Sequence, residues 1–119
     1  MTVVRRFVAA GIACGVLMTA SAASPEESAV HQVSIAANSF LFAPQAISIS
    51  RGDRVRWTNN DTQMHMIVTA KPESNGKELE IYHRLGPGTS FEHQFTTPTA
   101  YYYYCAIHFQ MWGIISVNP

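Results

Sequence analysis

The chain has 119 residues, a formal net charge of zero and a charged fraction of 13%. This length suits one domain and is too short for two, and a hydrophobic content of 47% indicates a packed core rather than a disordered chain. Lys and Arg are neither in excess nor gathered in an extended run, which excludes the electrostatic footprint of a nucleic-acid-binding protein.

Residues 1–23 have the pattern of a secretory signal peptide. Arg5 and Arg6 precede a short apolar stretch over residues 7–18, and small residues follow it. The stretch is too short for a typical membrane-spanning helix, so we expect cleavage after Ala22 or Ala23 and no membrane span in the mature chain. The sequence thus predicts an exported, periplasmic protein with a flexible lead over residues 24–30 and one domain over residues 31–119.

Alternating apolar and polar residues mark a series of short strands. Val33 and Ile35 fall on one face of the first strand, and Val55 and Trp57 fall on one face of the third. The predicted strands are residues 31–36, 45–49, 54–58, 66–70, 78–85, 89–96, 101–104 and 113–118. Turn-forming residues separate them and no segment has helical periodicity, so we predict an all-β sandwich of seven or eight strands.

Several large or polar side chains have a structural explanation in this fold. We expect Phe40 and Phe42, in the connection before the second strand, to cap the core, and Trp112 to lie within it. We expect His31 to be exposed. His83 and His93 are expected to face solvent or to be hydrogen-bonded.

Cys105 is the only cysteine outside the predicted signal peptide. A single cysteine in an exported chain cannot form an internal disulfide, so it is buried and inert, paired with another chain, nucleophilic or a metal ligand. His108 and Met111 follow it at three-residue intervals, on a loop between two predicted strands. A thiolate, an imidazole and a thioether together suit copper better than zinc, magnesium or calcium. Nucleophilic catalysis is disfavoured, because no orienting acid is readable and methionine has no part in it.

A blue-copper site needs a second histidine, because its trigonal plane holds two His and one Cys beneath a long axial Met. His65 is the candidate. It follows the predicted strand over residues 54–58 and a polar turn, and it opens the next strand. A histidine in this position can point into the same end of the sandwich as the loop that carries Cys105.

With these residues, the sequence resembles the cupredoxins, the small type 1 copper proteins of the plastocyanin/azurin class. The Cys-x-x-His-x-x-Met spacing from Cys105 to Met111 is similar to the short ligand loop of amicyanin, and residues 54–61 are similar to the strand and turn before the first ligand of the family. The resemblance covers roughly residues 31–118 and implies a Greek-key β-sandwich that holds one type 1 copper ion. The ligands that it implies are His65, Cys105 and His108 in the plane and Met111 on the axis.

The resemblance also implies a function. It predicts a monomeric blue-copper electron carrier, not an enzyme, that shuttles single electrons between redox partners by Cu(I)/Cu(II) cycling. Partners would dock transiently near His108 and Phe109. Met64 and Met66 depart from the family pattern, which often has Pro before the first histidine and a small polar residue after it that helps to hold the Cys sulfur.

Two alternatives to electron transfer remain open on the sequence alone. A periplasmic copper-delivery protein would use its methionines and histidines to bind Cu(I) and hand it on; its candidate residues are Met64, His65, Met66, His108 and Met111. A metal-free sandwich would serve as an interaction module. Fast reversible redox favours the carrier, transfer of the metal favours delivery, and failure to bind copper favours the module.

Overall fold

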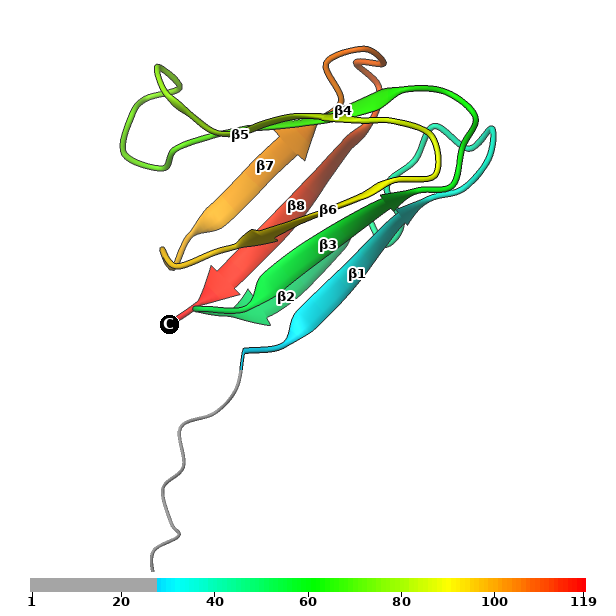
Figure 1. Cartoon of the computed structure of the whole chain (residues 1–119). Coiled ribbons are helices and arrows are strands. Elements are labelled where there is room, and N and C mark those ends of the chain that lie inside the picture. Colours follow the sequence, from blue (N-terminus) through cyan, green and yellow to red (C-terminus); the bar gives the residue numbers. More distant parts are fainter. Residues whose placement is uncertain (1–27) are drawn as a thin grey trace, which may run out of the picture.

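The computed structural model of the protein describes residues 28–119, so the predicted signal peptide and the first part of the predicted lead lie outside the described residues. Residues 28–119 form eight β-strands in two facing sheets (Figure 1). None of these residues belongs to a helix that could cross a membrane. The all-β sandwich predicted from the alternating pattern is confirmed.

The two sheets differ in size and share the long axis of the sandwich. The smaller has the order β1-β3-β6, and the larger has the order β2-β8-β7-β4-β5. The smaller sheet consists of β1 (Val30–Ile35), β3 (Arg54–Asn59) and β6 (Ser90–Gln94). The larger consists of β2 (Ala46–Ser50), β8 (Trp112–Asn118), β7 (Ala100–Tyr104), β4 (His65–Ala70) and β5 (Leu79–Leu85). Two pairs, β1 with β3 and β2 with β8, are parallel, and the other pairs are antiparallel.

The core forms where the alternating strands turn their apolar faces inward. Val33, Ile35, Val55 and Trp57 are fully buried, as their spacing predicts. The Trp57 ring meets the ring of Tyr103 at 5.4 Å between centroids, which joins the two sheets by an edge-to-face aromatic pair.

Trp112 is 46% exposed, so its predicted place in the core is wrong. It opens β8, in which the buried positions are Gly113, Ile115 and Val117, and the opposite parity turns Trp112 outward. Packing explains why position 113 is a glycine. A Cβ at this position would lie 2.4 Å from Cζ of Tyr103, so the aromatic ring occupies the space of a side chain.

One end of the sandwich gathers the segments that carry the candidate ligands. The connections that follow β1, β3 and β7 lie at this end, away from the C-terminus (Figure 1). A strand that ends here presents its last residues to the same small volume, which is how a rigid scaffold positions a site built from loops.

Candidate metal centre

Three of the four candidate ligands meet at this end of the sandwich. Ligand atoms of His65, Cys105 and His108 lie within 4.8 Å of one another. Sγ of Cys105 lies 3.9 Å from Nδ1 of His65 and 3.7 Å from Nδ1 of His108. His65 and Cys105 are completely buried, whereas His108 is half-buried. The structure therefore brings together a thiol and two imidazole nitrogens from β4 and the β7–β8 loop.

Met111 is fully buried and belongs to the same tight loop. Its backbone N–H donates to the carbonyl oxygen of His108 at 2.9 Å, and its own carbonyl oxygen accepts from the N–H of Cys105 at 3.0 Å. These two bonds close the loop on itself. The three-residue spacing of the motif thus becomes a compact turn with the thioether side chain in the interior.

The Cys105 sulfur also accepts a hydrogen bond from the backbone. The N–H of Met66 lies 3.4 Å from Sγ of Cys105. The main chain thus supplies a donor to the sulfur at the position where the family often has a small polar side chain. Met66 itself is buried, and Met64 is 39% exposed, so the two methionines that flank His65 face different surroundings.

Asp61 is a buried residue of the site that the sequence analysis missed. Its Oδ2 lies 3.0 Å from Nε2 of His65, and neither side chain is exposed to solvent. The hydrogen bond from His65, aided by those from the backbone N–H groups of Thr62 and Asn38 and opposed by burial, holds the pKa of Asp61 below its ordinary value. The available signal was an aspartate four residues before the candidate histidine, within a polar turn.

Asn59 fixes the turn between β3 and β4. Its Nδ2 donates to the carbonyl oxygens of Gln63 at 2.8 Å and Leu85 at 2.9 Å, and its Oδ1 accepts from the N–H of Asp61 at 2.9 Å. An Asx side chain that bonds to the backbone two residues on is a common way to shape a turn. Asn59 therefore sets the path of the chain that leads to His65.

Phe40 covers both histidines rather than capping only the core. Its ring centroid lies 4.9 Å from that of His108 and 6.2 Å from that of His65. Phe40 has a φ of +53° and Asn38 a φ of +61°, so the connection after β1 bends through the left-handed region twice to place this ring. Phe42 is buried and contacts Tyr103, as a core cap should.

Exposed apolar side chains neighbour the site in sequence. Phe109 is 78% exposed, as predicted, and Ile107 on the other side of His108 is 43% exposed. Leu41, next to Phe40, and Met64, next to His65, are also exposed. The half-buried imidazole of His108 therefore comes from a loop with an apolar surface.

The other histidines lie outside the cluster. His93 is hydrogen-bonded to Glu80 at 3.0 Å, and His83 stacks on Phe91 at 3.9 Å between ring centroids. His31 was expected to be exposed, but it is partly buried, with Nε2 3.0 Å from Oδ2 of Asp53. The prediction that His31 is exposed is wrong, because its partner Asp53 comes from a turn that is distant in the sequence.

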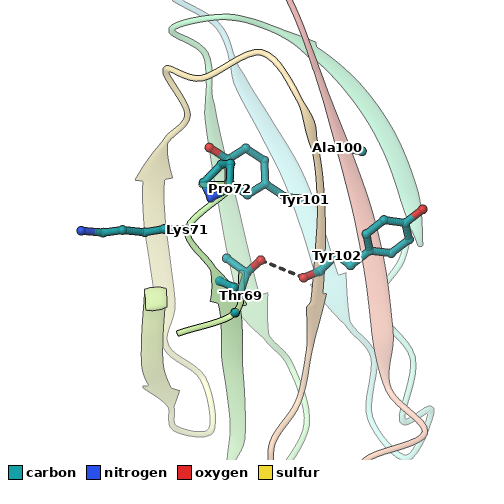
Figure 2. Close-up of a pocket in the computed structure, with 8 residues that line it drawn as sticks. Thr69, Lys71, Pro72, Ala100, Tyr101 and Tyr102 are labelled. Atoms are coloured by element: carbon teal, nitrogen blue, oxygen red, sulfur yellow. Dashed lines mark hydrogen bonds between the residues drawn. The ribbon is translucent and has the colours of Figure 1, made fainter. Parts of the chain in front are cut away.

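A hollow of about 230 Å³ lies toward the opposite ends of β4 and β7, where Oγ1 of Thr69 donates to the carbonyl oxygen of Tyr102 at 2.7 Å (Figure 2). Thr69, Tyr101 and Tyr102 line it with parts of the β4–β5 connection, and none of the candidate ligands does. The hollow is therefore separate from the candidate metal centre.

The family of copper-binding proteins that contains plastocyanin and azurin matches this chain over residues 29–118. The chain belongs to the plastocyanin/azurin family. As a cupredoxin, it has one copper ion as its cofactor. Plastocyanin from Scenedesmus fuscus is 33% identical over 73 residues, which cover 57% of this chain and 74% of that protein.

Solved cupredoxin structures have the same fold. A purple cupredoxin from Nitrosopumilus maritimus is 28% identical, with a TM-score of 0.64 over 74% of this chain and 99% of that one. A reduced amicyanin mutant is 21% identical, with a TM-score of 0.66 over 75% of this chain and 82% of that one. At this identity the amicyanin likeness concerns the fold alone.

The residues present fit copper by their chemistry. Two imidazole nitrogens and one thiol sulfur converge in a buried volume, with a thioether residue buried in the same loop. This is the donor set of a blue-copper site, and its mixture of soft and borderline atoms suits both oxidation states of copper.

Proposed function

We propose that this protein is an exported electron carrier in which His65, Cys105, His108 and Met111 would hold one type 1 copper ion. Bound copper supplies a one-electron couple between its +1 and +2 states. The observation that supports this proposal most is the position of the Cys105 sulfur, between two imidazole Nδ1 atoms at 3.9 and 3.7 Å.

The protein scaffold keeps these donor atoms together. His65 begins a strand of the larger sheet, and Cys105 directly follows β7, so both are tied to the hydrogen-bonded sheet. His108 is held by the loop bond from the N–H of Met111. Donor atoms fixed in this way need to move little when the charge of a bound metal changes. The structural barrier to electron transfer at the site should therefore be small.

Burial and a backbone hydrogen bond influence the chemistry of the Cys105 sulfur. Cys105 has no exposed surface, which keeps water from its thiolate. The N–H of Met66 offers a hydrogen bond to this sulfur at 3.4 Å, which withdraws electron density from it. Such outer contacts are among the ways in which a protein tunes a blue-copper potential.

We place the electron port at His108, with a docking surface around it formed by Met64, Ile107 and Phe109. His108 is the least buried member of the ligand cluster, and these three side chains are exposed and apolar. A small apolar surface fits weak, short-lived contacts between redox proteins. The carrier would act as a monomer in the periplasm. Residues 1–23 would be removed, and residues 31–119 would form the folded domain.

Copper delivery is the weaker candidate. Hand-over of Cu(I) would need soft ligands that an acceptor can reach. Met66 and Met111 are buried, and only Met64 of the three methionines near the site is exposed. The structure thus offers one accessible thioether, which suits a docking surface better than a transfer path.

The deciding experiment is the visible and EPR spectrum of the purified protein after addition of Cu(II), with Cys105→Ser as the control. We expect an intense thiolate-to-copper band and a narrow copper hyperfine splitting, both lost in the variant. A pale tetragonal Cu(II) signal that survives Cys105→Ser would place copper elsewhere and refute the proposed site.

A further inference from the structure

Asp61 presents a buried carboxylate to the candidate ligand His65 on the side away from the sulfur. The side chains of Asp61 and His65 have no exposed surface, and Oδ2 lies 3.0 Å from Nε2. The other oxygen, Oδ1, accepts the backbone N–H groups of Thr62 at 2.7 Å and Asn38 at 3.3 Å. Backbone N–H groups can only donate, so Asp61 acts as an acceptor here.

The bond to Asp61 decides which nitrogen of His65 carries the proton. A neutral imidazole has one N–H and one lone pair, and the hydrogen bond made by one nitrogen determines the role of the other. If Nε2–H donates to Asp61, the lone pair lies on Nδ1. This is the nitrogen that faces Sγ of Cys105 at 3.9 Å.

Among residues 28–119, no lysine or arginine forms an ion pair with Asp61. Within the part of the chain that the structure describes, its ion-pair partner is His65. Charges interact far more strongly in a protein interior than in water. A buried negative charge next to a ligand therefore favours the more positive state of a bound metal.

Asp61 also anchors the connection that covers the site. It accepts the N–H of Asn38, two residues before Phe40, whose ring contacts both histidines. One carboxylate thus ties together the turn before β4, the first candidate ligand and the covering loop.

We propose that Asp61 is a positioning residue of the copper site, which holds His65 in the Nε2–H tautomer with Nδ1 free for the metal and favours Cu(II) over Cu(I). The proposal rests on the proposed role of His65 as a ligand. It predicts that loss of the Asp61 charge weakens copper binding and raises the reduction potential.

The chain contains a matched control for this test. Asp53 accepts the backbone N–H groups of Ala29 and Ser50, each at 3.0 Å, and lies 3.0 Å from Nε2 of His31. Like Asp61, it bonds to two backbone N–H groups and one histidine, but none of its partners is a candidate ligand. Asp53→Asn therefore removes an aspartate–histidine pair without touching the copper site.

The first measurement uses metal-free protein. Nitrogen-15 NMR of the histidine rings reports which nitrogen is protonated, and we expect Nε2–H at His65 in the wild type and in Asp53→Asn. In Asp61→Asn, one amide atom is a donor only, so the amide cannot serve both His65 and the backbone N–H groups. We expect the Nε2–H signature to be lost.

The second measurement uses copper-loaded protein. Outer contacts to a metal-bound histidine typically contribute about 10–100-fold to metal affinity, so we expect a loss in this range for Asp61→Asn and no loss for Asp53→Asn. The potential of Asp61→Asn should rise, and a tenfold greater loss of Cu(II) than of Cu(I) affinity corresponds to about 59 mV for one electron. Asp61→Glu keeps the charge and should retain more of the wild-type potential than Asp61→Asn.

Clear results would overturn the proposal. A proton on Nδ1 of His65 in the metal-free wild type would do so without any variant, even if Asp61→Asn failed to fold. Equal potentials in the wild type and Asp61→Asn, or equal shifts in Asp61→Asn and Asp61→Glu, would do so as well. Absence of a type 1 spectrum in the wild type would instead refute the proposed function, and the tautomer would still report on Asp61.

Discussion

The two ends of the sandwich carry aspartate–histidine pairs with the same contacts and different surroundings. The side chains of Asp61 and His65 at the ligand end have no exposed surface, whereas those of Asp53 and His31 at the opposite end are 12% and 32% exposed. Water reaches the second pair and screens it, so it serves mainly to fasten the start of β1 to the turn before β3. The first pair is shielded from water, and one of its members, His65, is a proposed ligand. Burial and neighbouring groups, rather than the pair itself, therefore determine what an aspartate–histidine contact does.

Gly113→Ala should disturb both ends together, because Gly113 lies in the core that joins them. The added Cβ would lie within 2.4–2.7 Å of atoms of the Tyr103 ring, which is itself packed against Trp57 and Phe42. Overpacking of this kind costs about 1–3 kcal/mol. Urea unfolding of metal-free protein would measure the loss.

Ser116→Ala is the control for this variant, since Ser116 is a half-exposed position of the same strand. We expect the midpoint of Ser116→Ala to stay close to that of the wild type. A Gly113→Ala midpoint equal to that of Ser116→Ala would show that the Tyr103 ring can move aside.

Phe109→Asp should affect the ligand end alone. It places a charge on the proposed docking surface, where loss of one important side chain costs about 1.4 kcal/mol or more, which is about tenfold in affinity. Stopped-flow exchange with the natural redox partner should therefore slow, while the copper spectrum stays unchanged.

Tyr82→Asp is the matched control for Phe109→Asp. Tyr82 is 69% exposed on β5 and comes from none of the loops at the site. It should exchange electrons at the wild-type rate. Equal rates for Phe109→Asp and the wild type would place the docking surface elsewhere.

The smallest expected effect is the contribution of the Asp53–His31 pair to stability at acid pH. Hydrogen bonds from the N–H of Ala29, from His31 and from the N–H of Ser50 lower the pKa of Asp53 from 3.8 to about 2. A carboxylate with a lowered pKa contributes stability above its unfolded value and loses it as the pH falls through the folded value. Stability should therefore decline between about pH 4 and pH 2, and less steeply in Asp53→Asn.

Unfolding of the metal-free protein followed across this pH range would test the prediction. Asp61 also has a lowered pKa and remains in Asp53→Asn, so part of the decline should persist in this variant. Identical acid limbs in both proteins would mean that Asp53 contributes nothing measurable.

The sequence was informative where the signal is local. Alternation of apolar residues located the strands, and the spacing of Cys105, His108 and Met111 on one loop located three of the proposed ligands. It was not informative where a role depends on contacts between distant segments. Asp61 lies only four residues before His65, but its hydrogen bond to the N–H of Asn38, which ties it to the connection after β1, could not be read from the sequence. Trp112 misled because size and apolarity suggested burial, while the parity of its strand was set by the fit of Gly113 against Tyr103.

The order of strands in the larger sheet bears on when the site can form. β2 pairs with β8 and has no other strand neighbour in that sheet, although five strands, β3 to β7, lie between them along the chain. Such non-local pairing is slow, and a chain that is still being synthesised cannot complete it. Cys105, His108 and Met111 lie just before β8, so a nascent chain has no assembled place for a metal. Copper should therefore bind only after β8 has joined the larger sheet and the domain is folded.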